Sequence, residues 1–383
     1  MKRFDFIKKE LLELKTEHLY RTFKTIENID GVKVTINGKE LINFCSNNYL
    51  GLANHPKVIE RTIAILKKYG VGSGASRLVS GNFDIHEQLE KKIAEYEGTE
   101  AAIVFPTGYM ANLGTIQALV GPEDAVIVDR LNHASIIDGA KLSGAKILVY
   151  GHNYIEKLEK ALKKKATGYR RKLVVSDFIF SMDGDVALVE EMLDLAEKYN
   201  AMLMLDLAHS TGVVDLVMPE GHNIILMGTL SKAIGSLGGF VAGSRDLIDY
   251  LRNKARPFIY TTALPPAVAA AALASFEIIS KDNSLQKKLW NNVEYLRKKI
   301  EPLKFDLIGS KTQIIPLMIG ETKKTLDISQ YLFDNGIFLS AIRPPTVPKD
   351  TSRLRLTVTA MHTKSDIDHL VEKLKEAKEK YLS

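Results

Sequence analysis

Short apolar runs alternate with helical segments through the middle of the chain. The segments between the runs, such as 155–165 and 189–199, repeat apolar residues at helical spacing. Uninterrupted apolar runs are typical of strands that are buried on both faces, and their alternation with helices predicts an α/β fold with a mostly parallel central sheet and helices on both faces. The runs are 101–105, 125–128, 146–149, 173–175, 202–205 and 224–227.

The two ends of the chain follow different patterns. Residues 4–24 have apolar positions at helical spacing, and Asn37-Gly38 between two short apolar runs predicts a hairpin with a type I′ turn. A helix of small residues at 265–280 is followed by shorter alternating helices and strands. We therefore predict an N-terminal arm, a large domain and a smaller α+β domain. Their boundaries are 1–45, 46–281 and 282–383.

Composition narrows the class of protein. A chain of 383 residues with 45% hydrophobic residues can bury a large core, and no stretch approaches the ~20 uninterrupted apolar residues of a membrane span. The 52 Lys and Arg residues are interleaved with 46 Asp and Glu, so the net charge of +6 does not predict nucleic acid binding. Cys45 is the single cysteine, which fits a reducing cytoplasm, and no export signal is expected.

Polar side chains that follow two of the apolar runs are candidates for catalysis, because ligands of open α/β sheets bind beyond the carboxyl ends of the strands. Asp206 and His209 follow one run, and Lys232 follows the next within a loop of small residues. A desolvated lysine at such a position is suited to nucleophilic amine chemistry. Taken alone, Asp206 and His209 fit an ordinary structural role better, and Lys232 could be an ordinary surface lysine, but the three together favour a catalytic site.

Three further segments carry weaker signals. Gly108 and Tyr109 open a helix after a strand, where amides and the helix dipole can bind phosphate. His133 begins another helix, where its ring could stack on a planar cofactor or simply be structural. Arg353 and Arg355 share one strand face, and either could bind a carboxylate. The glycine-rich run 70–81 lacks a known phosphate-binding spacing.

At these residues the chain resembles the α-oxoamine synthase family of fold-type I pyridoxal-phosphate (PLP) enzymes. The lysine motif of that family is similar to Thr229-Leu-Ser-Lys232-Ala-Ile-Gly, and the likeness covers nearly the whole chain. Residues 74–81 and 341–348 resemble one branch specifically. That resemblance implies an acyltransferase that condenses L-alanine with a pimeloyl thioester, with release of carbon dioxide and the carrier thiol, in biotin synthesis.

The resemblance also implies roles for individual residues. Lys232 is expected to bond covalently to the cofactor and act as general base, Asp206 to pair with the pyridine nitrogen, His209 to contact the ring hydroxyl, and His133 to stack on the ring and contact substrate. Other cofactor positions are Gly108, Tyr109, Thr229 and Ser181, together with Thr261 and Thr262, which are expected to reach the partner's site in a homodimer with shared active sites. Substrate positions are Arg21, Thr346 and Arg355.

Two other functions stay open at this stage. A sister synthase would use glycine and a short acyl-CoA such as acetyl-CoA, whereas a PLP lyase such as a threonine aldolase would need no thioester. A binding protein without catalysis is disfavoured because Lys232, Asp206 and His209 are all present. The sequence leaves open whether coenzyme A or an acyl carrier protein delivers the acyl group, and no metal is expected.

Overall fold

A computed structural model describes residues 3–215 and 224–382 of the chain, and these fall into two compact units. The larger unit comprises Asn47–Ser181 and Asp185–Lys287, and the smaller comprises Met1–Ser46, Met182–Gly184 and Lys288–Ser383. The smaller unit therefore combines both ends of the chain. The division into an arm and two domains remains a prediction.

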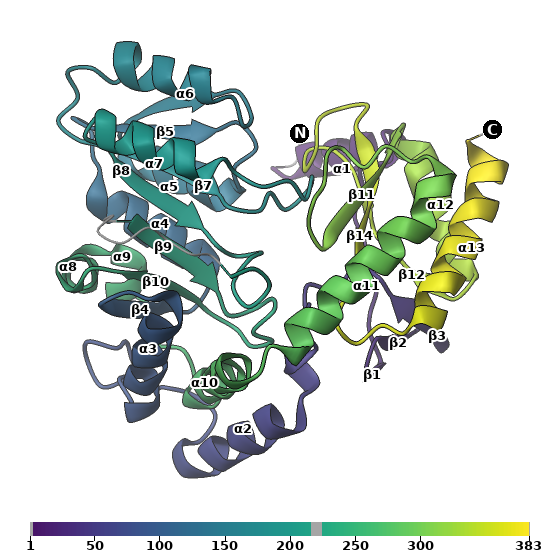
Figure 1. The fold of residues 1–383 in the computed structure, drawn as a ribbon, viewed down its shortest axis with the longest axis horizontal. Helices are drawn as coiled ribbons and strands as arrows, with labels where there is room; N and C mark the ends of the chain where they lie inside the picture. The colour runs from purple at the N-terminus through teal and green to yellow at the C-terminus, as the bar shows by residue number, and fades with distance from the viewer. Residues whose placement is uncertain (1–2, 216–223, 383) are drawn as a thin grey trace. The chain divides into compact units, whose positions relative to one another are not determined.

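A seven-stranded sheet forms the centre of the larger unit (Figure 1). The strands β5 to β9 pair in parallel, and only β10 is antiparallel to its two neighbours. The predicted, mostly parallel sheet is thus confirmed. In spatial order the strands are β4 (Ala101–Phe105), β10 (Gly239–Gly243), β9 (Ile224–Thr229), β8 (Met202–Asp206), β7 (Lys172–Asp177), β5 (Ala125–Asp129) and β6 (Lys146–Tyr150).

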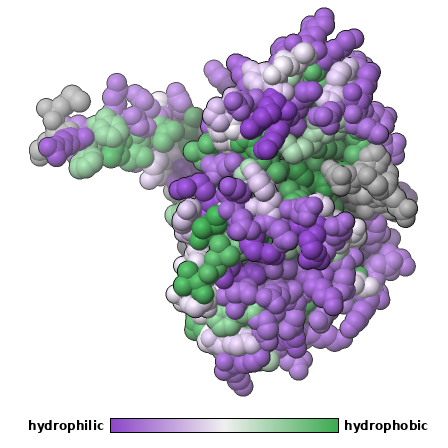
Figure 2. Space-filling view, turned by 90° about the vertical axis from the view of Figure 1, so that its left-hand side faces the viewer, coloured by the Kyte–Doolittle hydropathy of each residue, from purple (hydrophilic) through white to green (hydrophobic). Residues whose placement is uncertain are grey.

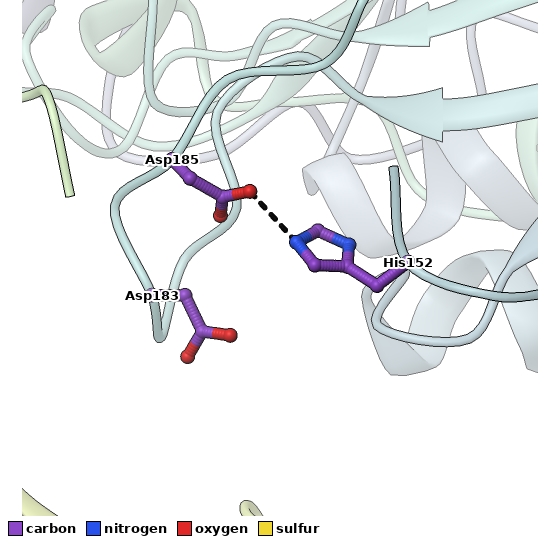
Figure 3. A group of neighbouring side chains, drawn as sticks. All are labelled: His152, Asp183 and Asp185. Atoms are coloured by element: carbon purple, nitrogen blue, oxygen red, sulfur yellow. Dashed lines mark hydrogen bonds and ion pairs between the residues drawn. The ribbon is translucent and has the colours of Figure 1, made fainter. Parts of the chain in front are cut away.

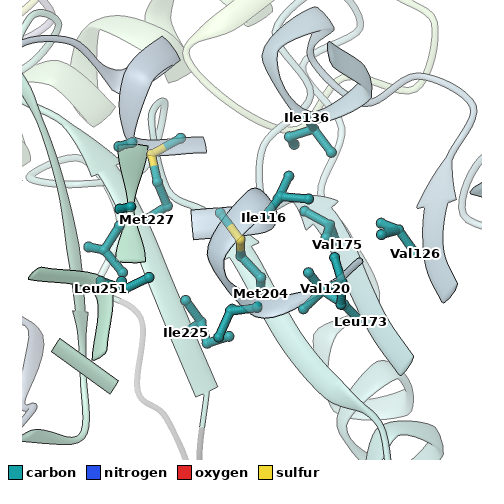
Figure 4. Close-up of a cluster of buried hydrophobic side chains, with 14 of the residues drawn as sticks. Ile116, Val120, Val126, Ile136, Leu173, Val175, Met204, Ile225, Met227 and Leu251 are labelled. Carbon is teal, nitrogen blue, oxygen red and sulfur yellow. The ribbon is translucent and has the colours of Figure 1, made fainter. Parts of the chain in front are cut away.

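Helices cover both faces of this sheet (Figure 1). On one face, Ile116, Ile136 and Leu251 of three different helices pack on buried strand residues such as Val175 and Met204 (Figure 4). Each such side chain contributes roughly 1.5–3 kcal/mol on burial, which fixes the helices against the strands. The helices are α2 (Pro56–Tyr69), α3 (Asp84–Glu97), α4 (Gly108–Leu119), α5 (Ala134–Ser143), α6 (Ile155–Lys160) with a π-helical turn (Ala161–Lys165), α7 (Val189–Lys198), α8 (Arg245–Lys254), α9 (Arg256–Ile259) and α10 (Pro266–Lys281).

The smaller unit contains two small sheets. One has the order β1-β2-β3-β12, in which β12 joins β3 in parallel, and the other is the antiparallel sheet β11-β14-β13. Helix α11 (Ser284–Ile300) begins in the larger unit and continues into the smaller one. The other elements are α1 (Asp5–Thr16), β1 (Asn28–Asp30), β2 (Lys33–Ile36), β3 (Lys39–Asn43), β11 (Ile314–Gly320), α12 (Thr322–Asp334), β12 (Ile337–Phe338), β13 (Ala341–Ile342), β14 (Ser352–Thr357) and α13 (Lys364–Tyr381).

The N-terminal arm differs in part from its prediction. The hairpin turn is confirmed, since Asn37 and Gly38 both have positive φ (52° and 69°), as a type I′ turn requires. Helix α1 ends at Thr16 rather than near residue 24. The reason is local: His18 has a φ of 59°, a left-handed conformation that cannot continue a right-handed helix.

Apolar side chains on α1 face solvent (Figure 2). Phe6 is 51% exposed and Leu12 is 64% exposed, so this helix has an uncovered apolar side. With 12 residues it is too short to cross a bilayer. Over residues 3–215 and 224–382, no helix combines the length and apolar character that a membrane span requires.

A partly buried histidine, His152, connects the loops at the carboxyl edge of the central sheet. The ring of His152 contacts Asp129 through Nδ1 (3.1 Å) and Asp185 through Nε2 (2.7 Å; Figure 3). Burial lowers the pKa of His152, but the hydrogen bonds to the two carboxylates outweigh burial and raise it to about 9. Asp183, on the same loop as Asp185, pairs with Arg353 within the smaller unit.

We expect this histidine to make stability depend on pH. Its pKa is about 9 in the folded protein and ~6.5 in the unfolded chain, so its stabilising contribution is complete below pH ~6.5 and is lost as pH rises through 9. After allowance for solvent screening, the loss should be about 1–2 kcal/mol in the free energy of unfolding. Urea unfolding at pH 6 and pH 10 should show this loss of stability in the wild type. The control variant His18→Gln, which changes an exposed histidine, should show the same loss. The interpretation is wrong if His152→Gln shows the same loss.

Candidate active site

A cavity of about 220 Å³ opens in the larger unit at the carboxyl ends of β8 and β9. It brings together most of the cofactor positions that the sequence predicts. The lining residues are Thr107, Gly108, Tyr109, Asn112, His133, Ser135, Asp177, Asp206, Ala208, His209, Met227, Thr229, Ser231, Lys232 and Leu237.

Lys232 lies on the loop after β9 and reaches across the cavity to His209. The distance between Lys232 Nζ and His209 Nε2 is 2.9 Å. The other ring nitrogen of His209, Nδ1, lies 2.7 Å from the hydroxyl of Tyr49, which is fully buried. Both nitrogens of this imidazole therefore have hydrogen-bond partners, which fixes the ring beside the lysine amine. The contribution of Tyr49 was not foreseen from the sequence.

Asp206 ends strand β8 and is almost completely buried. One carboxylate oxygen accepts from the amide of Ala208 (2.9 Å), and the other accepts from Asn112 Nδ2 (2.8 Å). Asn112 also donates to Ser135 Oγ (2.9 Å). These bonds hold the carboxylate in one orientation at the base of the cavity. Asn112 and Ser135 gave no signal in the sequence, because each is an unremarkable polar residue within a helix.

His133 is the N-cap of α5 and lies at the cavity wall. Its Nδ1 accepts from the backbone amide of Ser135 (3.3 Å) and contacts Ser135 Oγ (2.7 Å), so Nε2 carries the ring proton. Burial lowers the pKa of His133, and nearby Lys232 lowers it further against the opposing effect of Asp206. The ring is therefore neutral near pH 7, as suits stacking on a planar group.

Asp177, which was not predicted, lies beside Asp206 because the two end neighbouring parallel strands in register. Burial raises the pKa of Asp177 well above its usual range, and the Asp206 carboxylate adds to this shift. Its Oδ2 accepts from the backbone amide of His133 (2.8 Å). Burial and the neighbouring carboxylate therefore both favour the protonated form of Asp177.

The opposite wall is the N-terminus of α4. Thr107 caps the helix by accepting from the amide of Met110 (3.1 Å), and the first-turn residues Gly108 and Tyr109, whose amides have no partner within the helix, line the cavity. Gly108 packs so closely that a Cβ there would lie 3.3 Å from Thr229 Oγ1. Thr229 is itself fixed by donating to the carbonyl of Gly238 (2.9 Å). Helix amides, a dipole and hydroxyls make this wall suited to a phosphate group.

These walls fit pyridoxal phosphate. The anion-binding helix end, the buried carboxylate and the lysine amine surround one space, and Asn112 Oδ1 is a buried acceptor with no partner among the described residues.

Comparison with known proteins agrees with this fit. The model for aminotransferase class I and II matches residues 39–374. The chain belongs to this family.

Curated relatives of this chain are called 8-amino-7-oxononanoate synthase. The protein from Thermoanaerobacter pseudethanolicus is 47% identical, with 95% of this chain and 94% of the relative covered. The protein from Citrifermentans bemidjiense is 46% identical, with 94% of each chain covered. The resemblance inferred from the residues is therefore confirmed.

Solved structures superpose over most of the chain. Serine palmitoyltransferase from S. paucimobilis, solved with a PLP-myriocin adduct, has a TM-score of 0.92 at 32% identity and covers 99% of this chain and 98% of that one. The 8-amino-7-oxononanoate synthase of Francisella tularensis has a TM-score of 0.74 at 27% identity, with 89% and 99% covered. The expected cofactor, PLP, is confirmed at the level of the family.

Other predicted positions lie outside the lining of this cavity. In the smaller unit, Arg21 Nη2 donates to the carbonyl of Pro344 (3.3 Å) and lies 3.5 Å from Thr346 Oγ1, which joins two predicted substrate positions from opposite ends of the chain. Arg355 is buried on β14, whereas Arg353 is occupied by its ion pair with Asp183. The roles of these residues remain predictions, as do those of Ser181, Thr261 and Thr262.

The glycine-rich run 70–81 is held by structural contacts within the larger unit. Arg77 forms two parallel hydrogen bonds to the carboxylate of Glu90 (2.8 and 2.9 Å). Ser73 Oγ donates to the carbonyl of Leu264 (2.8 Å), and the amide of Ala263 donates to the carbonyl of Ala75 (3.0 Å). The run therefore anchors the loop that carries Thr261 and Thr262, and among the described residues it does not line the cavity.

Gly239 offers a test of the phosphate wall. A Cβ at this position would lie 2.5 Å from Gly108 Cα and 2.6 Å from its nitrogen, so Gly239→Ala must displace the turn that begins α4. We expect the Kd for PLP to rise at least about tenfold, which is about 1.4 kcal/mol. Fluorescence titration of the cofactor-free chain measures this change. Gly121→Ala, where a Cβ meets nothing within 4 Å, is the control. Equal effects of both variants would show that the turn is not part of the cofactor site.

Proposed function

We propose that this enzyme condenses L-alanine with a pimeloyl thioester to give 8-amino-7-oxononanoate, carbon dioxide and the free carrier thiol, as a step of biotin biosynthesis. A carbon–carbon bond forms between alanine Cα and the acyl carbon, the carbon–sulfur bond breaks, and the alanine carboxylate leaves as carbon dioxide. The observation that carries the proposal is that Lys232, His209 and Asp206 lie together in one cavity. The chain is also 47% identical to a relative called 8-amino-7-oxononanoate synthase.

Each wall of the cavity supports a role toward the cofactor. The amides at the start of α4, with Thr229, would hold the phosphate, Asp206 the ring nitrogen and its proton, and His133 the face of the ring. When bound, PLP supplies an electron sink for the negative charge that develops at alanine Cα. Asp206 suits its role because burial raises the pKa of its neighbour Asp177, which favours the protonated form of that neighbour.

The protein's own residues would manage the protons. Lys232, as a neutral amine, is placed to accept the Cα proton and to return a proton later in the cycle. His209, 2.9 Å from that amine, keeps the nitrogen in position. Arg355 is proposed to bind the alanine carboxylate through its two-pronged guanidinium, and Arg21 with Thr346 to bind the acyl substrate.

We further propose a cytoplasmic homodimer in which Thr261 and Thr262 reach the partner's cofactor phosphate. Both lie outside the cavity lining of their own chain, which leaves them available to another copy. Large apolar side chains at the surface also support self-association: Val71 is 82% exposed, Val79 is 80% exposed, and α1 presents further ones. The acyl carrier is coenzyme A or an acyl carrier protein.

Substrate choice can be tested directly. With pimeloyl-CoA and with a pimeloyl carrier-protein thioester, we expect L-alanine to give a product of the mass of 8-amino-7-oxononanoate, and thiol release only when both substrates are present. Mass spectrometry and a thiol assay measure these outcomes. Glycine with acetyl-CoA, and L-serine with palmitoyl-CoA, are the matched alternatives. Faster turnover with either pair would assign the enzyme to a sister reaction, and amino acid cleavage without any thioester would make it a lyase.

Shared active sites predict complementation between inactive variants. Lys232→Ala lacks the reactive amine, and the Thr261→Ala/Thr262→Ala double variant lacks the hydroxyls proposed to reach the partner. A hybrid dimer of the two variants holds one intact site out of two. Random pairing in an equimolar mixture makes about half of the dimers hybrids, so about a quarter of wild-type activity should return. Differently tagged chains verify that hybrids form. Hybrids without activity would show that each chain completes its own site.

A further inference from the structure

A hydrogen-bonded chain of side chains runs from the cavity into the protein interior. It begins at Lys232, passes through His209 (2.9 Å from Nζ to Nε2) to the Tyr49 hydroxyl (2.7 Å from Nδ1), and ends at Asn47 Oδ1 (3.0 Å from the hydroxyl). All four residues belong to the larger unit. Asn47 and Tyr49 come from a segment that the proposed reaction leaves without a role.

The direction of these bonds determines where the imidazole proton lies. The Tyr49 hydroxyl has one proton, which it donates to Asn47 Oδ1. Its oxygen then accepts from His209, so Nδ1 of a neutral His209 is protonated and Nε2 presents a lone pair to Lys232. We propose that Tyr49 is a positioning residue that holds His209 in this tautomer, so that Nε2 can accept a proton from the lysine ammonium.

The proposed transfer is a simple proton movement. One N–H bond of the Lys232 ammonium breaks, a bond to His209 Nε2 forms, and the products are a neutral amine and an imidazolium whose Nδ1–H still donates to Tyr49. The positive charge therefore moves without loss of any hydrogen bond. A lysine must lose this proton before it can act as a nucleophile or base. With the other tautomer, Nε2–H would face the amine and no acceptor would be available there.

The surrounding structure prevents Tyr49 from turning away. Its side chain is fully buried, and its amide donates to the carbonyl of Asn47 (2.8 Å) in a tight turn. The loop of Lys232 packs directly on this segment: Gly235 has a φ of 69°, and a Cβ there would lie 2.3 Å from the amide nitrogen of Ala53. Glycine at 235 thus permits the close approach that brings the lysine and tyrosine segments together.

The tautomer can be measured on the full chain without cofactor or substrate. In ¹⁵N-histidine NMR spectra, with the His209 signals assigned by their loss in His209→Asn, we expect protonated Nδ1 and unprotonated Nε2 in wild type. Tyr49→Phe should reduce the ratio of this tautomer to the other at least about fivefold, because the acceptor for Nδ1–H is removed. Tyr199→Phe is the matched control, since that hydroxyl bonds Glu159 (2.9 Å) and does not line the cavity.

A second readout follows the lysine itself. The rate at which PLP is captured covalently by the chain at pH 8, followed by absorbance and by borohydride fixation, should fall at least fivefold in Tyr49→Phe and stay unchanged in Tyr199→Phe. If Tyr49→Phe does not fold, Asn47→Ala should shift the tautomer ratio in the same direction, because the hydroxyl proton is then released from its acceptor. Circular dichroism checks folding of each variant.

Protonated Nε2 in wild type, or an unchanged ratio in folded Tyr49→Phe, would overturn the inference. The inference rests on the proposed role of Lys232, yet the NMR measurement involves neither alanine nor a thioester. A failed substrate assay with the expected tautomer would therefore contradict only the proposed reaction. The expected product together with the wrong tautomer would contradict only the role of Tyr49.

Discussion

The candidate site depends on how one buried negative charge is accommodated. Asp206 and Asp177 end neighbouring strands in register, so two carboxyl groups share an almost completely buried place. Ionising both would cost several kcal/mol, because neither could be fully hydrated. Burial raises the pKa of Asp177, which favours its protonated form, and the Asp206 carboxylate accepts from the Ala208 amide and from Asn112. The surrounding polar residues are arranged around that charge.

The same charge links two residues that would otherwise act separately. Asn112 bonds both Asp206 and Ser135, and Ser135 in turn contacts His133 Nδ1. This connects the carboxylate proposed to pair with the cofactor ring to the imidazole proposed to cover the face of that ring. Because α4 and α5 pack on each other through an apolar core (Figure 4), their polar ends are held in register. A site of this kind needs the core beneath it as much as its own hydrogen bonds.

Much of the fold could be predicted from the apolar pattern, because strands buried on both faces are continuous apolar runs. The run 101–105 coincides with β4, and the helix predicted at 265–280 coincides with α10 to within one residue at each end. The end of α1 could not be predicted, since the apolar spacing continues past Thr16 and only the left-handed backbone of His18 stops the helix. Apolar periodicity records burial and gives no information on backbone conformation at single residues.

The residues of the site likewise fall into those that the sequence could predict and those that it could not. Lys232, Asp206 and His209 could be predicted because they stand directly after buried strands, where a polar residue is conspicuous. Tyr49 and Asp177 could not, since their contribution is a hydrogen bond or a shared proton that exists only once distant segments meet. Tyr49 reads as one more aromatic in a buried segment, and nothing in its spacing indicates His209, 160 positions later. Polar residues that line a cavity at the ends of strands can thus be found from their place in the fold, whereas their hydrogen-bond partners from distant segments become visible only through geometry.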